Sequence, residues 1–222
     1  MEKIKIVYED NHVIVVVKPG GIPSQADKSG DRDMLTMVKE YIKEKYSKPG
    51  AVYLGLVHRL DRMTSGLMVF AKTSKAASRL SNNIREGDFK KEYIAAVTGV
   101  LEGKGELENY LFKDERTNIS CVVGESKKNA KLAKLEYKVI GNTVYKDKNY
   151  TYVKIKLHTG RHHQIRVQFS NVNNPLYGDV KYGGIKGDLA LVACNLSFIH
   201  PTKDEYMEFE YMPKKDGIWR DI

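Results

Sequence analysis

Cysteine is scarce in this chain, and its two cysteines, Cys121 and Cys194, lie far apart. Their spacing is not that of a zinc site, and two isolated thiols do not make the disulfide framework of a small secreted protein. The N-terminal stretch Met1–Ile6 lacks the apolar core of a signal peptide. Aliphatic runs such as Val13–Val17 are far too short to cross a bilayer. These absences predict a cytoplasmic protein with reduced thiols and no membrane contact.

Acidic residues are outnumbered by basic ones. The 222 residues include 37 Lys and Arg against 28 Asp and Glu, so the net charge is 37 − 28 = +9 at pH 7. Such an excess favours a polyanionic partner, most often nucleic acid, although it also serves solubility. Lysine outnumbers arginine, which suits attraction to a phosphate backbone better than dense reading of bases.

Motifs of several other enzyme classes are missing. Gly20-Gly21 is not followed by Gly-Lys-Ser/Thr, which excludes a P-loop NTPase. Thr64-Ser65 has no accompanying His–Asp relay, which disfavours a serine hydrolase. No second acid accompanies Asp61, as a nucleoside hydrolase would need to manage water. The adjacent His162-His163 is remote from both cysteines, which disfavours a zinc site.

The hydrophobic pattern predicts more strands than helices, in no regular alternation. Strands are expected at Val13–Val17, Tyr53–Val57, Leu67–Ala71, Phe89–Val97, Lys134–Val139, Tyr152–Leu157, Leu189–Leu196 and Met207–Met212. Helices are expected after an Asp33 cap with Leu35, Val38, Tyr41 and Ile42 inside, from Ser74 with Ala77, Leu80, Ser81 and Ile84 inside, and over His162–Phe169 with His162 and Arg166 on one face. No flexible linker or repeat interrupts the chain, so the pattern predicts one α+β domain over residues 1–222.

Asp61 lies between Arg59 and Arg62 in a short segment bordered by apolar runs. An acid flanked by arginines at the end of core structure should be ionised at neutral pH, which makes it a candidate nucleophile or base. Considered alone, the segment fits a structural ion pair at least as well. His58 resembles a catalytic base, but no nucleophile stands near it, so a structural role in the Asp61 turn is favoured.

Further segments change that balance. They are Lys18-Pro19-Gly20-Gly21, His58-Arg-Leu-Asp61-x-x-Thr-Ser-Gly-Leu67, Lys91-x-Tyr93, Thr159-Gly-Arg161-x-His-Gln-Ile-Arg166 and Pro175-Leu-x-Gly-Asp-x-x-Tyr-Gly183. In this order they resemble the RluA-type family of RNA pseudouridine synthases, over about Tyr8 to Tyr211. Two departures stand out. Gln168 replaces a histidine that many members carry, and the chain starts directly with the catalytic region, with no small N-terminal RNA-binding domain of the S4 type.

The resemblance implies a reaction that needs no metal or cofactor. The N1–C1′ bond of a uridine within RNA breaks, the uracil rotates, and it is rejoined through C5. Asp61 would be the essential carboxylate, attacking the ribose or removing its 2′ proton; the residues leave both routes open. Tyr93 would lie against the uracil and help to remove the C5 proton. Arg166 would pair with Asp61 and keep it ionised.

The same resemblance implies a central mixed, largely antiparallel sheet with flanking helices and a basic active-site cleft. The expected partner is structured RNA, tRNA or 23S rRNA, bound by a monomer. A target uridine must leave its stack, and Arg59 is placed to fill the gap. Arg62, Lys91, Arg161 and His162 are the other expected RNA contacts. The run Lys127–Lys138 and the outer faces of Lys134–Val139 and Tyr152–Leu157 are expected to be basic. A catalytically idle RNA-binding module is the rival interpretation, which the combination of Asp61, Tyr93 and Arg166 disfavours.

Overall fold

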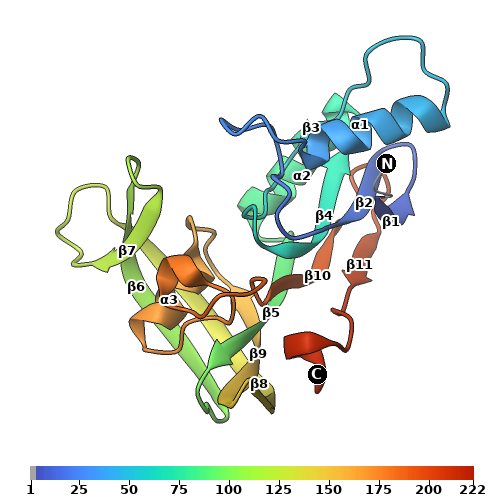
Figure 1. The fold of residues 1–222 in the computed structure, drawn as a ribbon. Helices are drawn as coiled ribbons and strands as arrows, with labels where there is room; N and C mark the ends of the chain where they lie inside the picture. The colour runs from blue at the N-terminus through green and yellow to red at the C-terminus, as the bar shows by residue number, and fades with distance from the viewer. Residues whose placement is uncertain (1–3) are drawn as a thin grey trace. The chain divides into compact units, whose positions relative to one another are not determined.

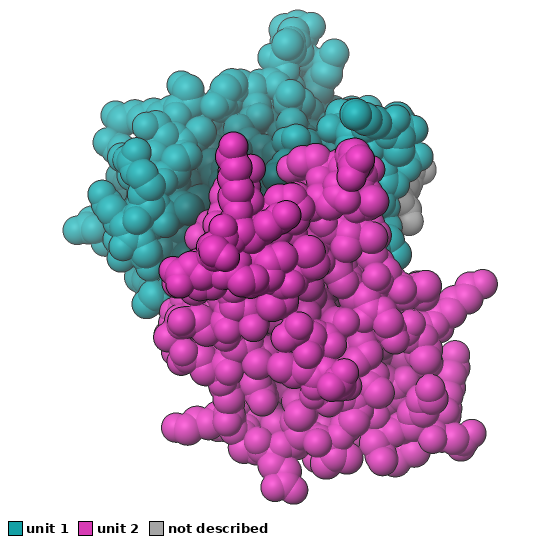
Figure 2. All heavy atoms as spheres, turned by 90° about the vertical axis from the view of Figure 1, so that its left-hand side faces the viewer, with its two compact units in different colours: residues 1–91, 193–212 teal, residues 92–192, 213–222 magenta. Residues whose placement is uncertain are grey.

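A computed structural model describes residues 4–222, so Met1–Lys3 of the stretch examined for a signal peptide lie outside it. The chain divides into two compact units, coloured separately in Figure 2. Unit 1 comprises the chain up to Lys91 together with Ala193–Met212, and unit 2 comprises Glu92–Val192 together with Pro213–Ile222. Each unit is thus built from two separate stretches of sequence. The single domain over residues 1–222 stays a prediction.

The fold is α+β, with a mixed, largely antiparallel sheet and three α-helices among residues 4–222 (Figure 1). The strands are β1 (Lys5–Glu9), β2 (Val13–Lys18), β3 (Gly55–Leu56), β4 (Ser65–Ala71), β5 (Lys90–Thr98), β6 (Lys104–Asp114), β7 (Ile119–Val123), β8 (Lys131–Tyr145), β9 (Lys148–Leu157), β10 (Leu191–Ile199) and β11 (Tyr206–Glu210). The helices are α1 (Met34–Lys45), α2 (Ser74–Glu86) and α3 (Gln164–Asn171), with 3₁₀ turns η1 (Val180–Tyr182) and η2 (Gly217–Trp219). Within the described residues no helix is both long and apolar enough to cross a membrane.

Unit 1 is centred on β2 and β4, two strands that are buried along almost their whole length. The strand order is β1-β2-β4-β10, with β11 on β10 and β3 on β4. The strands β2 and β4 run antiparallel, and Val15 lies opposite Val69. Because side chains alternate along a strand, Val15 and Val69 face α2 and its Leu80, while Val16 and Met68 are buried on the other face. Continuous apolar strands fit a sheet that is covered on both faces.

The first two helices begin where the sequence predicts, but the buried stripe of α2 differs. Asp33 caps α1 by accepting a hydrogen bond from the Thr36 N–H. Thr73 caps α2, which then begins at Ser74 as expected. The α2 residues that are buried are Ala76 and Leu80, whereas Ile84 is exposed. The expected stripe is therefore wrong at Ile84, whereas Leu80 is buried and the half-buried Ala77 packs against the same core as Ala76.

Unit 2 consists of the antiparallel strands β5-β9-β8-β6-β7 with α3 on one face (Figure 1). The Phe169 ring packs edge-on to Tyr137 of β8, with 5.3 Å between ring centroids. Gln168 is fully buried, and its amide Nε2 donates to the carbonyls of Leu107 and Ala133 and to the Asn109 side chain. The residue that departs from the family pattern thus fastens α3 to the sheet.

The start of α3 differs from the prediction of a helix over His162–Phe169. The helix begins at Gln164, and His163 before it has a left-handed backbone with φ of 53°. The Gln164 side chain accepts hydrogen bonds from the Thr159 hydroxyl and the Arg161 N–H, so it fixes the preceding residues as a turn. His162 consequently lies outside the helix and does not share a helical face with Arg166.

Candidate functional site

Asp61 of unit 1 lies in a turn between β3 and β4, and its side chain is half-buried. Its carbonyl accepts the Thr64 N–H at 3.1 Å, which closes the turn. The preceding residue, Leu60, is held on both sides by Ser24, whose hydroxyl donates to the Leu60 carbonyl at 2.7 Å and accepts its N–H at 3.1 Å. The backbone on each side of the carboxylate is therefore fixed.

A buried lysine supports this turn from beneath. Lys18 has no exposed surface, and its Nζ donates to the carbonyls of Pro19, Ile22 and Arg62 at 2.9, 2.6 and 2.8 Å. The Gly21 N–H donates to the same Arg62 carbonyl at 2.9 Å. Burial lowers the pKa of Lys18 to about 7, the negative charge of Asp61 opposes this shift, and the positive charge of Arg62 adds to it. The Lys18–Gly21 segment thus ties the Asp61 turn to β2.

The two arginines that flank Asp61 in sequence behave differently. Arg62 is engaged by a neighbouring loop, where its guanidinium pairs with Asp27 and Asp31. Hydrogen bonds from Ser29 and then Arg62 lower the pKa of Asp27 to about 2. Arg59 is exposed, and no hydrogen bond or ion pair with residues 4–222 holds its side chain. The guanidinium of Arg62 is thus held by Asp27 and Asp31, and its role as an RNA contact stays a prediction.

His58 has a structural place in unit 1, as expected. Its Nε2 accepts the N–H of Val69 at 3.0 Å, so the ring proton must lie on Nδ1. The ring packs against Phe89 with 5.0 Å between centroids. Burial and then the positive charge of Lys91 hold the pKa of His58 well below its usual value. Burial also lowers the pKa of Lys91 itself. His58 is therefore neutral and bonded to the core strand beside Asp61.

Tyr93 and Arg166 belong to unit 2. Tyr93 is buried on β5, opposite Ile155 of β9. Arg166 is buried on α3, and its Nε and Nη2 each donate to one oxygen of Asp179 at 2.7 Å. Such a two-bond pair fixes both position and plane of a guanidinium. Gly178 before Asp179 has φ of 80°, and a Cβ there would collide with the Asp188 backbone. Only glycine fits, and the turn delivers Asp179 to Arg166.

The two histidines before α3 stack on each other. The ring centroids of His162 and His163 are 3.7 Å apart at an interplanar angle of 27°. Burial, followed by positive neighbours, lowers the pKa of His162 to about 4 and that of His163 to about 2. Both rings are therefore neutral at physiological pH. The remaining predicted contact, Arg161, is exposed, and its Nε donates to the Leu132 carbonyl at 2.7 Å.

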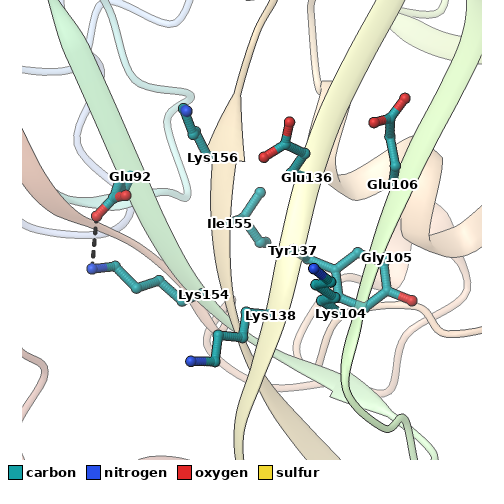
Figure 3. A pocket seen from close by; sticks show the side chains of 10 residues that line it. All are labelled: Glu92, Lys104, Gly105, Glu106, Glu136, Tyr137, Lys138, Lys154, Ile155 and Lys156. Carbon is teal, nitrogen blue, oxygen red and sulfur yellow. Dashed lines mark ion pairs between the residues drawn. The ribbon is translucent and has the colours of Figure 1, made fainter.

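The sheet face around Lys138 and Lys154 is hollowed by a cavity of about 560 Å³ (Figure 3). Lys104, Lys138 and Lys154 stand opposite one another on three adjacent strands. The next row carries Glu106 and Glu136, and Glu92 forms an ion pair with Lys154 at 2.7 Å. Lys156 lies between Glu136 and Glu92 in that second row, so the outer face that was expected to be basic mixes lysines and glutamates.

No role was assigned from the sequence to three residues that have a clear structural role in the fold, Lys18, Asp179 and Tyr182. Lys18 was seen only as part of a turn, although a lysine before Pro-Gly-Gly at the end of an apolar strand is the available signal. Asp179 and Tyr182 were part of a quoted motif, and both contact Arg166. Among residues 4–222, no three His, Cys, Asp or Glu side chains form a group able to hold a metal ion.

Comparisons with known proteins agree on one family. The RNA pseudouridylate synthase profile matches residues 12–171. An RNA pseudouridine synthase from Aquifex aeolicus, described as uncharacterized, is 34% identical over 223 residues, covering 93% of this chain and 68% of the relative. The ribosomal large subunit pseudouridine synthase D of Neisseria meningitidis serogroup A is 35% identical over 234 residues, and this chain spans 59% of its length. The structure of human RNA pseudouridylate synthase domain containing 1 superposes with a TM-score of 0.78 at 26% identity, covering 96% of this chain and 84% of the human one.

Proposed function

The chain belongs to the RluA-type RNA pseudouridylate synthase family, and on that premise we propose that it converts uridine to pseudouridine within structured RNA. The observation that carries the proposal is the Asp61 turn. Its sequence follows the family motif, and Lys18, Ser24 and Thr64 hold its backbone in one conformation. A half-buried carboxylate on a rigid turn is suited to act on a sugar that is brought to it.

In this proposal three side chains carry the chemistry. Asp61 attacks C1′ of the ribose or removes the 2′ proton, and either route needs the ionised carboxylate. Tyr93 lies against the uracil and assists removal of the C5 proton. Arg166 supplies the counter-charge that keeps Asp61 ionised, and its pairing with Asp179 keeps the guanidinium oriented before RNA binds. The isomerisation neither adds nor removes atoms or electrons, so no cofactor or metal is proposed.

Access to the target uridine is the second part of the proposal. A stacked base must be extruded, which costs a few kcal/mol. Arg59 lies two residues before Asp61 and is exposed. We assign it to the space that the uridine leaves, where a planar guanidinium can stack and donate hydrogen bonds. Arg62, Lys91, Arg161 and His162 are proposed to contact the RNA around the extruded nucleotide.

For the RNA itself we propose large-subunit rRNA or tRNA, recognised by a monomer. The Neisseria relative is named for the ribosomal large subunit, which makes 23S rRNA the first substrate to test. The net charge of +9 suits binding to either RNA through phosphates.

The decisive experiment combines purified protein with 23S rRNA and tRNA transcripts and maps pseudouridine without added ATP, nicotinamide or metal. Asp61→Asn and Asp61→Ala should fold and bind RNA yet form no product. If Asp61→Ala kept a tenth of the wild-type rate, Asp61 would not be the essential carboxylate. EDTA should leave the rate unchanged on RNA that stays folded. Pseudouridine maps of total RNA from cells with and without the gene would then identify the natural site.

A further inference from the structure

Tyr182 of unit 2 packs directly on the guanidinium of Arg166. The centre of the ring lies 5.1 Å from the guanidinium carbon, while Asp179 holds the Nε–Nη2 edge. Aromatic faces attract such a cation, and the attraction grows when the pair is desolvated. Tyr182 and Arg166 are both buried. The guanidinium is thus held along one edge by a carboxylate and across one face by an aromatic ring.

The hydroxyl of Tyr182 bonds to two other elements of the unit. It accepts the backbone N–H of Ser120 on β7 at 2.9 Å, and it lies 2.8 Å from Nδ1 of His163. His163 is neutral, because burial lowers its pKa to about 2. We therefore assign the hydroxyl proton to a hydrogen bond toward Nδ1 of His163. One phenol thereby joins β7, the turn before α3 and the face of Arg166.

The neighbouring contacts support the same arrangement. The Ser120 hydroxyl lies 2.9 Å from Nδ1 of His162, which stacks on His163. The Lys181 ammonium donates to the carbonyl of Asn118, in the connection from β6 to β7, at 3.2 Å. The Ser170 hydroxyl of α3 donates to the Tyr182 carbonyl at 2.7 Å. The β6–β7 hairpin, η1 and α3 are therefore bonded together around Tyr182.

We propose that Tyr182 is a positioning residue, which fixes the guanidinium of Arg166 in its reactive orientation by anchoring it to the β6–β7 hairpin. This inference rests on the proposed function, in which Arg166 serves the Asp61 carboxylate. The hydroxyl contributes the anchor and the ring contributes the contact with Arg166. Loss of the hydroxyl alone should therefore loosen Arg166 without removing its neighbour.

The test is a double-mutant cycle with Tyr182→Phe and Arg166→Lys, measured as single-turnover isomerisation. Tyr182→Phe should lower the maximal rate about 10-fold, which is less than the 10²–10³-fold lost when a preorganised donor is removed. The RNA concentration that gives the half-maximal rate should stay within about 2-fold of the wild-type value. In the Arg166→Lys background, the same substitution should cost little more, because residues that act as a unit are not additive. Tyr150→Phe is the matched control. Tyr150 is also buried, and its hydroxyl has no partner among residues 4–222.

A second pair of variants keeps the proposal testable if Tyr182→Phe does not fold. His163→Asn provides a side-chain oxygen that can accept a hydrogen bond from the Tyr182 hydroxyl. Asparagine also tolerates the left-handed backbone at this position. His163→Gly tolerates the backbone but offers no acceptor. His163→Asn should therefore keep more of the single-turnover rate than His163→Gly. Equal losses would contradict the anchoring role of the hydroxyl.

A readout that does not use activity separates this inference from the proposed function. The Nε–H of Arg166, bonded to Asp179, should exchange slowly in NMR spectra of the wild type and of Tyr150→Phe, and faster in Tyr182→Phe. Additive rate losses, or unchanged exchange in Tyr182→Phe, would overturn the positioning role. If the wild type formed no pseudouridine while the exchange difference remained, the proposed function would fail and the role of Tyr182 in orienting Arg166 would stand.

Discussion

Replacing Asp179 by asparagine removes the carboxylate charge that is bonded to Nε and Nη2 of Arg166, and it changes the shape of the side chain little. The Asp179 side chain has no exposed surface, and that of Arg166 is 7% exposed. Asparagine offers one oxygen in place of two, and its amide donors would meet the donors of the guanidinium. Removing one partner of a buried pair costs about 3–5 kcal/mol, because the buried guanidinium loses the carboxylate that accepts from its Nε and Nη2.

For a chain of this length, each kcal/mol shifts the melting temperature by about 2–4 °C. Asp179→Asn should therefore melt about 6–20 °C below the wild type in a thermal scan. Asp31→Asn is the matched control, since Asp31 pairs with Arg62 but its side chain is 58% exposed. Solvent screens such a pair, so this variant should melt close to the wild type. If both variants melted alike, the buried pair would not contribute as its geometry indicates.

Four further outcomes are expected. Arg166→Ala should lose roughly 10²-fold in single-turnover rate, and Arg166→Lys should recover only part, because an ammonium cannot hold both oxygens of Asp179. Arg59→Ala should slow the reaction on a structured stem-loop far more than on RNA whose target uridine is already unstacked; equal losses would place Arg59 in the chemical step. RNA affinity should fall steeply with salt in filter binding, and a flat response would contradict phosphate-led binding. Lys18 loses its proton on folding between pH about 7 and its unfolded value of 10.5, so stability rises with pH in that window. Urea unfolding should show the wild type gaining about 2 kcal/mol over Lys18→Met from pH 7 to 9, and parallel curves would refute the buried-lysine assignment.

The core strands were predictable because burial on both faces leaves an uninterrupted apolar run. Val13–Val17 and Leu67–Ala71 became β2 and β4 for this reason. The strand β6 was missed, since Lys104–Asp114 is half-exposed and mixes charged, small and apolar residues. The first residue of α3 was missed as well. Nothing in the local pattern shows that Gln164 turns its side chain back onto the preceding residues.

The candidate catalytic residues were easier to predict from the sequence than the residues that hold them in place. Asp61, Tyr93 and Arg166 follow family motifs, so their identity could be predicted, and their roles stay predictions. The residues that hold them depend on tertiary contacts. Lysine is rarely buried. The burial of Lys18 is explained by the carbonyls of Pro19, Ile22 and Arg62, which accept hydrogen bonds from its ammonium group. Asp179 in Gly-Asp-Val looks like an ordinary turn residue until α3 brings Arg166 to it.

The discontinuous composition of unit 1 sets an order of events during synthesis. The strand β4 is complete at Ala71, but its neighbour β10 begins only at Leu191. A ribosome adding about 5–20 residues per second takes roughly 6–24 s to make the intervening chain. During that time β4 lacks its neighbour β10, and an unpaired apolar strand is prone to aggregation. The sheet of unit 1 is therefore completed only after most of unit 2 has been translated.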